Sequence, residues 1–379
     1  MRRVKTAIFG AGFMGRVHAE AARRLGNVDI VAVAGLPLEK AKEFADSIGV
    51  DRATDDYKEL LADPAIEVVE ICAPNDLHFP MAMDALRAGK HVICEKPLAT
   101  SIDEAKKMVA LAQRRNLRHC TFHNIRFYPQ AQNMRCIIEA DELGDIWVVQ
   151  GTYSQDWLLY DTDWNWRIET GPSRTFADIG IHWCDLLEHV TGLKLSSVCA
   201  NLRTFHKFRK KPAEATETFA GAAGQPAAFE TVPIRTEDFA GMLFQLGDTA
   251  SGVMTASQVS AGRKNQLRLE IYGSKSSVVW DAAHQEELWV GHRDEPNQVL
   301  VKSASQLRGE AQKYADLPAG HSEGYDDTFK QLMRRFYHAV IDEKAPIEYP
   351  TFEDGLRQLK IVEAVLKSSK RRGWVDVSA

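Results

Sequence analysis

The sequence predicts an α/β protein, with a parallel sheet in its first part and an α+β domain after it. Three observations support this prediction. Short apolar runs alternate with helical segments as far as residue 123, and a glycine-rich turn lies directly after the first run. Beyond residue 124, Trp, Tyr and Thr become frequent, and several segments alternate apolar with polar residues. Strands that alternate with helices form parallel sheets, whereas alternation along a segment is typical of antiparallel strands.

Each element of the first part follows from its own pattern. The apolar runs at residues 5–9, 29–34, 68–72, 91–94 and 118–122 are predicted strands. The segments at residues 13–25, 38–48, 80–88 and 102–115 are predicted helices, because their apolar residues recur at helical spacing. We expect right-handed connections between the parallel strands.

The second part is predicted from alternating segments at residues 147–154, 238–246, 250–257, 266–272, 277–280 and 287–291. Gly247 and Asp248 lie between two of these segments and predict a hairpin turn. Residues 210–231 are rich in Ala, Pro, Gly, Glu and Thr, and predict a mobile surface loop. Thr351 is placed to cap a helix over residues 351–370.

Length, charge and cysteine content limit the class of protein. The chain has 379 residues, which suggests two domains, and a net charge of −5. This charge argues against nucleic acid or an anionic membrane as a partner, so a small molecule is expected. No apolar run reaches the roughly 18 residues of a membrane-spanning helix, and no long apolar signal segment begins the chain. Six scattered cysteines form no C-x-x-C pair, and together these features predict a cytoplasmic protein with reduced thiols.

The glycine-rich turn has the sequence Gly10-Ala11-Gly12-Phe13-Met14-Gly15, between the first predicted strand and the first predicted helix. In this G-x-G-x-x-G context Gly10 allows a sharp turn, Gly12 lets the backbone approach a pyrophosphate, and Gly15 lets the helix pack on the sheet. The pyrophosphate would lie at the positive end of the helix dipole. The sequence therefore predicts a dinucleotide-binding domain.

Two further loops follow strands of the same predicted sheet. Ala73-Pro74-Asn75-Asp76-Leu77-His78 follows the third strand, and Glu95-Lys96-Pro97 follows the fourth. Ligands of an open parallel sheet lie across the carboxyl ends of its strands, so both loops should face the crevice of the glycine turn. The Lys96 ammonium would there orient a substrate hydroxyl and stabilise its ionised form. The alternative is an ordinary surface lysine.

Asp178, His182, Asp185 and His189 recur at intervals of four, three and four residues, and share one face if a helix begins here. A carboxylate beside an imidazole fixes its tautomer and raises its basicity, which makes His182 a candidate proton acceptor. Structural roles stay open, with Asp178 as a helix N-cap and His182 as a partly buried histidine. A metal site is not predicted, because no cysteine or distant cluster completes a ligand set.

Five of the eight tryptophans lie around this segment: Trp147, Trp157, Trp164, Trp166 and Trp183. Aromatic faces with polar edges suit sugar rings, whose C–H faces stack while their hydroxyls form hydrogen bonds. Trp147 is expected in the core of the second domain. Trp157, Trp164 and Trp166 lie in a polar, aspartate-rich loop, where a core position has less support.

In order and spacing, the glycine turn, Glu95-Lys96-Pro97 and the pair of Asp178 and His182 resemble the Gfo/Idh/MocA family, the relatives of glucose-fructose oxidoreductase and inositol dehydrogenase. Asn124-Ile125-Arg126-Phe127, Trp166-Arg167 and the helix after Pro350 extend the resemblance over nearly the whole chain. It implies a doubly wound Rossmann domain at residues 1–123, on which the helix at residues 351–370 packs. It also implies an α+β domain at residues 124–350, whose large open-faced, mainly antiparallel sheet binds substrate and joins subunits into a homodimer or homotetramer.

The resemblance also implies roles for individual residues. His182, with Asp178, would take the proton from a sugar or polyol hydroxyl as hydride passes to the nicotinamide, and Lys96 would assist. The implied cofactor contacts are Gly10, Ala11, Gly12, Phe13, Met14, Gly15, Gly35, Leu36, Lys40, Pro74, Asn75, His78, Glu95, Lys96, Asn124, Trp166 and Arg167. The implied substrate contacts are Arg126, Tyr128, Trp157, Asp178, His182 and Tyr325. Residues 151–157 are similar to the matching segment of anhydrosugar and sugar dehydrogenases in the family, which favours a carbohydrate.

One position departs from the NAD-specific pattern. After the second predicted strand, where an Asp or Glu would bond the ribose 2′-hydroxyl, this chain has Gly35-Leu36-Pro37. A 2′-phosphate is then tolerated, and Lys40 is placed to pair with it, where some NADP-using relatives have arginine. The sequence therefore predicts NAD or NADP as the cofactor and slightly favours NADP.

The predicted function is hydride transfer between a nicotinamide cofactor and a secondary hydroxyl or keto group of a sugar, anhydrosugar or polyol. Two alternatives stay open. One is an enzyme that retains NAD and cleaves glycosides through transient oxidation, as some family members do. The other is a non-catalytic dinucleotide-binding regulator. Such a regulator is expected to lack the lysine or the histidine, and this sequence has both.

Overall fold

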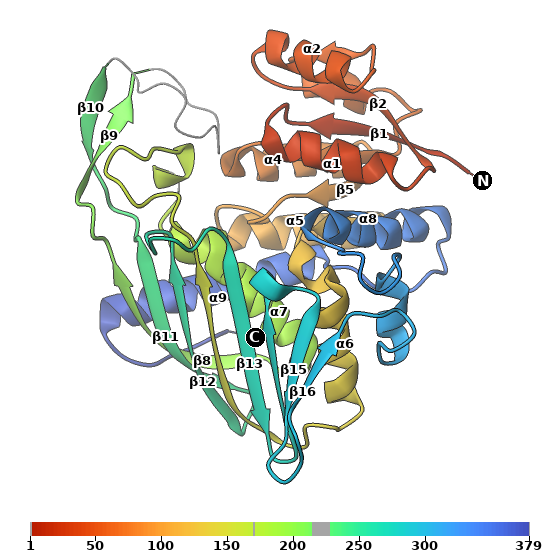
Figure 1. Cartoon of the computed structure of the whole chain (residues 1–379). Coiled ribbons are helices and arrows are strands. Elements are labelled where there is room, and N and C mark those ends of the chain that lie inside the picture. The colour runs from red at the N-terminus through yellow and green to blue at the C-terminus, as the bar shows by residue number, and fades with distance from the viewer. Residues whose placement is uncertain (1, 170, 214–227, 379) are drawn as a thin grey trace. The chain divides into compact units, whose positions relative to one another are not determined.

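The computed structural model describes residues 2–169, 171–213 and 228–378, and it divides into two units (Figure 1). The first unit comprises Met1–Phe127 with Gly324–Leu359, and the second comprises Tyr128–Glu323 with Lys360–Ala379. The sequence analysis placed the domain boundaries at residues 123 and 350. Helix α8 (Tyr325–Ile341), which that division grouped with the second domain, belongs by its contacts to the first unit.

The first unit is built on a six-stranded parallel sheet with the strand order β3-β2-β1-β4-β5-β6. Its strands are β1 (Val4–Phe9), β2 (Val28–Ala34), β3 (Ala53–Thr54), β4 (Val68–Ile71), β5 (His91–Cys94) and β6 (His119–Thr121). Its helices are α1 (Phe13–Arg23), α2 (Leu38–Ser47), α3 (Tyr57–Leu61), α4 (Asn75–Arg87), α5 (Ile102–Arg115), α8 and the start of α9 (Phe352–Arg371). This is the strand order of the doubly wound Rossmann fold, so the fold predicted for the first part is confirmed.

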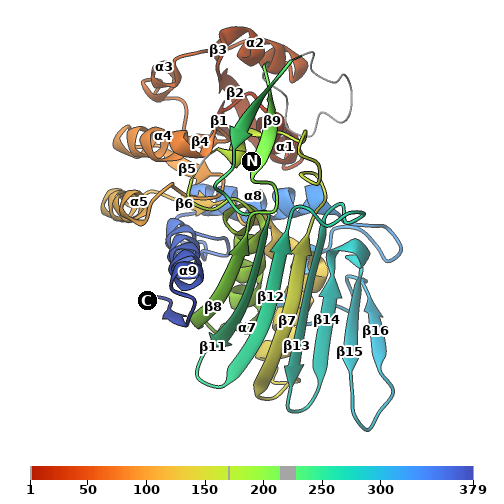
Figure 2. The same cartoon turned by 90° about the vertical axis from the view of Figure 1, so that its left-hand side faces the viewer.

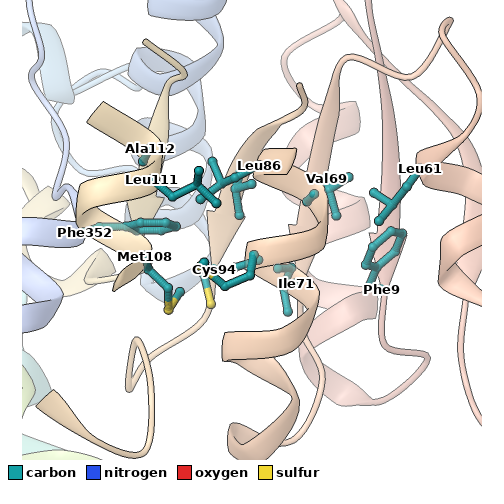
Figure 3. Close-up of a cluster of buried hydrophobic side chains, with 14 of the residues drawn as sticks. Phe9, Leu61, Val69, Ile71, Leu86, Cys94, Met108, Leu111, Ala112 and Phe352 are labelled. Atoms are coloured by element: carbon teal, nitrogen blue, oxygen red, sulfur yellow. The ribbon is translucent and has the colours of Figure 1, made fainter. Parts of the chain in front are cut away.

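Both faces of this sheet carry apolar side chains, and helices cover each face. On one face Ile8 and Val33 pack with Phe44 of α2. On the other face, strands β1, β4 and β5 pack against α3, α4 and α5 (Figure 3). The labelled members of this second core are Phe9, Leu61, Val69, Ile71, Leu86, Cys94, Met108, Leu111, Ala112 and Phe352. Because both faces are buried, the strands are apolar almost throughout, which is the pattern that predicted them.

The sequence analysis missed β3 and α3, and it began α4 too late. Helix α4 starts at Asn75, and Pro80 lies inside it. Proline is favoured in the first turn of a helix and removes a hydrogen bond further inside, so Pro80 makes the start of α4 difficult to predict from sequence. Asn75 and His78 therefore lie in the first turn of a helix and not in a loop.

The second unit contains a nine-stranded sheet in the order β16-β15-β14-β13-β7-β12-β11-β8-β17. Its strands are β7 (Ile146–Ser154), β8 (Leu195–Arg203), β11 (Phe239–Leu246), β12 (Ala250–Ser257), β13 (Gln266–Gly273), β14 (Ser277–Asp281), β15 (Glu287–Gly291), β16 (Gln298–Val301) and β17 (Val375–Asp376). Neighbouring strands are antiparallel except for the parallel pair of β7 and β12. The predicted α+β domain with a mainly antiparallel sheet is therefore confirmed, including the hairpin at Gly247.

Helices α6 (Pro129–Glu139) and α7 (Ile181–Thr191) pack against one face of this sheet. Figure 2 shows the opposite face, with α7 behind the strands. Trp183 of α7 is fully buried, and its Nε1 donates to the carbonyl of Arg268 at 2.9 Å. A Cβ at Gly151 of β7 would lie 2.4 Å from the Trp183 ring, so glycine at this position lets α7 lie close to the sheet.

Two expectations for the second unit are wrong. Trp147 is 56% exposed instead of buried, because the pairing of β7 with β13 shifts at this residue and leaves Trp147 without a partner in the register. Residues 210–212 and 229–231, expected in a loop, belong to β9 (Phe208–Pro212) and β10 (Phe229–Pro233), which form an antiparallel pair. Composition did not reveal these strands, because their side chains are largely polar or charged and only the backbone hydrogen bonds pair them. Residues 214–227 of the expected loop lie outside the described residues.

Among the described residues, no helix combines the length and the apolar character needed to cross a membrane. All six cysteines are free thiols. The cytoplasmic location stays a prediction.

Candidate active site

The turn between β1 and α1 contains the three motif glycines, and the packing of the protein itself requires two of them. Gly10 has a φ of +124°, and a Cβ there would lie 2.5 Å from the carbonyl oxygen of Cys72. A Cβ at Gly15 would lie 2.1 Å from the carbonyl oxygen of Gly10. At Gly12 a Cβ would meet no atom of the described residues within 4 Å. The packing thus gives no reason for glycine at position 12, where the sequence analysis expected a pyrophosphate to approach.

The N-terminus of α1 has the form of an anion site. Gly12 is the N-cap residue and no side chain caps the helix, so its first turn presents backbone N–H groups. The end of β2 lies against this turn, because a Cβ at Gly35 would be 2.9 Å from the Cβ of Ala11. The other residues predicted here are Phe13, which is 47% exposed, Met14, which is partly buried, and Leu36 and Lys40, which are exposed.

Lys96 lies two residues beyond β5, at the carboxyl edge of the sheet that also carries the glycine turn. Its backbone N–H donates to Oε2 of Glu95 at 3.0 Å. Pro74 precedes α4 at the same edge, and Asn75 is the first residue of that helix. The ring of His78 lies between two backbone carbonyls, with Nδ1 2.7 Å from that of Pro97 and Nε2 2.9 Å from that of Ala73. His78 therefore links the chain after β4 to the chain after β5.

A buried cluster of polar side chains lies next to Glu95, and sequence analysis missed most of it. His18 of α1 has its Nδ1 2.7 Å from Oε2 of Glu70 and its Nε2 3.1 Å from Oε1 of Glu95. The other Glu70 oxygen accepts from the hydroxyl of Tyr337, which lies 3.0 Å from Oγ1 of Thr6. All five residues are 6% exposed or less. We call these residues, Thr6, His18, Glu70, Glu95 and Tyr337, the His18 cluster.

His18 carries the positive charge of this cluster. Burial opposes its protonation, but the neighbouring Cys72, Glu70 and Glu95 outweigh burial and hold the pKa of His18 well above its usual value of 6.5. Desolvation raises the pKa of the Cys72 thiol to about 11, so this thiol is neutral near pH 7. The negative charge that stabilises the imidazolium therefore comes from the two carboxylates.

Three more predicted residues lie in the first unit, each with a contact that the sequence did not indicate. Asn124 is buried, and its Nδ2 donates to Oγ1 of Thr328 on α8 at 2.8 Å. Arg126 donates to Oδ1 of Asp354 on α9 at 2.8 Å. Burial opposes the Asp354 charge, but Arg126 and Thr351 hold the pKa of this carboxyl below its usual value. Tyr325 begins α8, is 37% exposed and packs edge-on against Phe329, with ring centroids 5.0 Å apart.

In the second unit, Asp178 lies in a π-helical turn, Phe176–Gly180, that leads directly into α7. Asp178 is therefore not the N-cap of a helix, and that structural alternative is wrong. Its Oδ2 accepts from Nε2 of Gln258 at 2.8 Å, and its Oδ1 lies 3.5 Å from Nε of Arg167. The structure thus brings Arg167, predicted at the cofactor, to the predicted catalytic carboxylate. Isolated π-helical turns are frequent at functional sites.

His182 lies in the first turn of α7 and is 8% exposed. Its ring centroid lies 6.4 Å from that of Tyr153 on β7. Asp185 and His189 share this helix but belong to other surroundings: Asp185 is 1% exposed, and Nε2 of His189 lies 3.0 Å from the side-chain amide of Gln132 on α6. No group of three or more His, Cys, Asp or Glu side chains in the described part of the chain is arranged to hold a metal ion.

A second buried cluster holds the segment that leads to Asp178. Asp238 lies between two guanidinium groups, because one of its oxygens accepts from both Arg174 and Arg209, the latter at 2.8 Å. The neighbouring Glu237 accepts from the backbone N–H of Phe176 at 2.8 Å. These four charged side chains are 3% exposed or less. We call these residues, Arg174, Arg209, Glu237 and Asp238, the Asp238 cluster.

The predicted aromatic residues of the second unit are partly buried. Nε1 of Trp157 donates to Oε1 of Gln155 at 2.8 Å, and both Trp157 and Trp164 pack on a small apolar cluster. Trp166 stacks with its neighbour Arg167, whose guanidinium lies 4.5 Å from the ring centroid. Tyr128 is only 4% exposed. Core packing therefore accounts for part of the tryptophan content around α7.

Comparison with known proteins matches both units to one family. A model of an oxidoreductase family with an NAD-binding Rossmann fold matches residues 4–123, and a model of the GFO/IDH/MocA C-terminal domain matches residues 131–279. Together the two matches extend over most of the chain.

The chain belongs to the Gfo/Idh/MocA family.

Relatives within the Gfo/Idh/MocA family are similar over their full length. Levoglucosan dehydrogenase from Pseudarthrobacter phenanthrenivorans is 29% identical over 100% of this chain and 99% of its own. The solved structure of a levoglucosan dehydrogenase complex with NADH and L-sorbose has a TM-score of 0.90 at 27% identity and covers 100% of both chains. That of an inositol dehydrogenase homologue from Azotobacter vinelandii, complexed with NADH and myo-inositol, has a TM-score of 0.87 at 27% identity, over 99% of this chain and 98% of its own. The predicted enzyme class, a nicotinamide-dependent dehydrogenase acting on CH–OH groups, is confirmed.

For this Gfo/Idh/MocA protein, sequence reasoning missed residues that hold the motif side chains in place. One of them had left a visible signal. Glu70 interrupts the apolar run of β4, and a carboxylate in a buried strand needs a partner. Gln258 and Asp238 left no comparable signal, because Gln258 directly follows β12 and Asp238 directly precedes β11, where polar residues are common.

Proposed function

We propose that this chain is an NAD(P)-dependent dehydrogenase that transfers a hydride between nicotinamide and a secondary hydroxyl or keto group of a sugar, anhydrosugar or polyol. The observation that carries the proposal is that Lys96 lies at the carboxyl edge of a Rossmann sheet, the edge at which the glycine turn begins. The NADH complexes of its levoglucosan and inositol dehydrogenase relatives support the same chemistry.

In this proposal, a bound nicotinamide nucleotide supplies the hydride acceptor. Its pyrophosphate would be held by the glycine turn and the N-terminus of α1, which fit an anion. His182 takes the proton from the substrate hydroxyl, and Asp178 favours the charged imidazole that results. Lys96 donates to the same substrate oxygen and stabilises negative charge on it. In the reverse direction His182 returns the proton to the oxygen of the keto group.

The contacts of Asp178 support its assignment. Gln258 and Arg167 each approach one of its two oxygens, so the carboxylate is held in one orientation. A carboxylate fixed in this way is suited to orient an imidazole four residues further along the chain.

Substitution of the two central residues tests the proposal. In Lys96→Ala and His182→Ala, we expect kcat to fall by about 10² to 10⁴, because each removes a positioned proton-handling group. NADH binding, measured by fluorescence titration, should change little. Lys42→Ala and His338→Ala remove exposed residues of the same types and serve as matched controls. If Lys96→Ala and His182→Ala turned over every accepted carbohydrate at the rate of the parent, the catalytic assignment would be wrong.

The same assay separates the dehydrogenase from an enzyme that cleaves glycosides by transient oxidation. A dehydrogenase produces one NADH for each substrate molecule oxidised, so turnover stops when a small amount of NAD is consumed. A glycoside-cleaving enzyme regenerates NAD in each cycle and continues to release sugar. A screen of sugars, anhydrosugars, polyols and inositols with catalytic and with excess cofactor therefore distinguishes the two activities.

The proposed cofactor is NAD or NADP, and the residues after β2 slightly favour NADP. Gly35 stands where an acidic side chain would bond the ribose 2′-hydroxyl and repel a 2′-phosphate. Lys40 is exposed in the first turn of α2, close in sequence to that position. We expect Lys40→Ala to raise KM for NADP several-fold and to leave KM for NAD unchanged.

A second copy of this chain is the proposed occupant of the face of the nine-stranded sheet that α6 and α7 do not cover. Val148, Leu243 and Val253 on this face are each at least 40% exposed. A hollow of about 410 Å³ on the sheet is lined by residues that include Tyr272 and Trp289. A two-fold pair would place this patch against itself. We expect a homodimer or homotetramer by sedimentation, and dissociation to monomers in the double variant Leu243→Glu and Val253→Glu.

A further inference from the structure

The His18 cluster links the helix of the glycine turn to the turn that carries Lys96. We propose that His18, through Glu95, is a positioning residue for Lys96 in the proposed dehydrogenase reaction. This inference rests on the proposed function for its kinetic consequence, while the contacts that carry it lie wholly within the first unit.

The first step is the connection itself. His18 lies three residues after Gly15, on the buried face of α1. Its Nε2 is 3.1 Å from Oε1 of Glu95, and the other oxygen of that carboxylate accepts the backbone N–H of Lys96 at 3.0 Å. One carboxylate therefore contacts both α1 and the Lys96 backbone. Glu95 is only 6% exposed, so water competes little for either bond.

The second step is what fixes His18. Its Nδ1 is 2.7 Å from Glu70, whose second oxygen accepts from the Tyr337 hydroxyl. The imidazole also packs on the ring of Phe122, with centroids 4.3 Å apart, and edge-on to Phe329 at 5.7 Å. Contacts on both nitrogens and on the ring leave His18 a single orientation, with its Nε2 directed at Glu95.

The third step is the choice of residue. An imidazolium donates from both nitrogens, so one side chain bonds two carboxylates and neutralises one of their charges. A neutral amide or hydroxyl in its place would remove the cation that lies between the two buried carboxylates, an unfavourable change in a dry interior. His18 therefore allows Glu95 to stay charged and buried, in the position where it holds the Lys96 backbone.

Two measurements on the full chain test this role. In His18→Leu we expect kcat to fall 10- to 100-fold, the usual effect of removing a group that orients an active-site residue, with Kd for NADH within about threefold of the parent. We also expect the amide hydrogen of Lys96 to exchange at least tenfold faster. The exchange measurement requires no substrate. A parent without dehydrogenase activity would therefore contradict the proposed function and leave the positioning role open to test.

His91→Leu is the matched control. His91 is a half-buried histidine at the opposite end of β5, and its Nδ1 accepts the backbone N–H of Arg118. Its loss should lower stability but leave kcat and the exchange of the Lys96 amide near parental values. Equal effects of His91→Leu and His18→Leu would show a general loss of structure and overturn the proposal, as would parental kcat and exchange in His18→Leu.

A second pair of variants keeps His18 in place, in case His18→Leu does not fold. In Glu70→Gln the side-chain amide still accepts from His18, and it donates to the Tyr337 hydroxyl, which then donates to Thr6. Glu70→Leu removes both bonds of residue 70. We expect kcat to fall about tenfold in Glu70→Leu. In Glu70→Gln we expect kcat to stay much closer to that of the parent. Equal kcat in the two variants would contradict the proposal.

Discussion

Two buried charged clusters each adjoin a segment with a residue proposed for catalysis, and they are arranged with opposite charge at the centre. In the His18 cluster a cation lies between two carboxylates, Glu70 and Glu95. In the Asp238 cluster a carboxylate lies between two guanidinium groups, Arg174 and Arg209. Each cluster adjoins a segment with a predicted catalytic residue, Lys96 in the first unit and Asp178 in the second.

Because the central charged groups differ, the two clusters respond differently to pH. The central charge of the first cluster belongs to a histidine, whose imidazolium loses its charge as pH rises through its raised pKa. The central charge of the second belongs to an aspartate. Burial opposes its charge, but Arg174 and Arg209 lower the pKa of Asp238 below its usual 3.8. The second support therefore keeps its charge at neutral pH, whereas the first is sensitive to alkaline conditions.

The largest expected effect comes from removing the central charge of the second cluster. Asp238→Asn leaves two buried guanidinium groups facing an amide, and breaking a buried ion pair in this way costs about 3 to 5 kcal/mol of unfolding free energy. Because Glu237 and Arg174 adjoin the chain before Asp178, kcat should also fall. Denaturant unfolding and initial rates on the same samples measure the two effects.

Asp248→Asn is the matched control for this substitution, because Asp248 is exposed in the hairpin turn between β11 and β12. It should change the unfolding free energy by less than about 0.5 kcal/mol. A cost for Asp238→Asn as small as that of the control would mean that the charge at the centre of the second cluster is unimportant, and the comparison would fail.

The two clusters also separate what the sequence could predict from what it could not. Lys96 and Asp178 were singled out because each belongs to a short run of residues with a recognisable pattern. Their supports come from far along the chain: Tyr337 reaches Glu70 across 267 positions, and Glu237 reaches Phe176 across 61. Local patterns carry no information on such pairs, because the fold alone brings them together.

The same limit explains the fold predictions. Strands β1, β2, β4, β5 and β6 were predicted because burial on both faces makes them apolar. Strand β3 has two residues, too few to form a pattern. Strands β9 and β10 contain charged and polar side chains, so their pairing cannot be predicted from hydrophobic periodicity.

An intermediate effect is expected at Gln258, which contacts Asp178 directly. Gln258→Leu removes the donor to Oδ2 of Asp178 and keeps the approach of Arg167 to Oδ1. We expect a loss of about 1 to 3 kcal/mol of unfolding free energy, typical of a buried hydrogen bond left unmade, and a fall in kcat of about tenfold.

Gln258→Glu sharpens this test, since it keeps the shape but replaces the donor with a second carboxylate next to Asp178. Its kcat should fall below that of Gln258→Leu at neutral pH and recover as pH is lowered and the pair takes up a proton. A pH–rate profile parallel to that of the parent would show that Gln258 does not act on the Asp178 carboxylate.

The smallest expected effect is a change in the pH dependence of stability, and it compares the two clusters within one experiment. The pKa of His18 is raised in the folded chain, so its stabilisation is complete below the unfolded value of 6.5 and is lost as pH rises through the folded pKa.

The pKa values of His78, His91 and His119 are lowered by burial, so these residues affect stability only below about pH 6.5. The contribution of His18 to the slope cannot exceed about 1.4 kcal/mol for each pH unit. The pKa of Asp238 is lowered, so its stabilisation is complete above the unfolded value of 3.8 and is lost only as pH falls through the folded pKa. Unfolding free energies measured from pH 7 to 9 should thus decline less steeply in His18→Gln than in the parent, whereas Asp238→Asn should keep the parental slope. Parallel slopes for the parent and His18→Gln would mean that His18 is neutral in the folded chain, and the contrast between the clusters would then be one of geometry and not of charge.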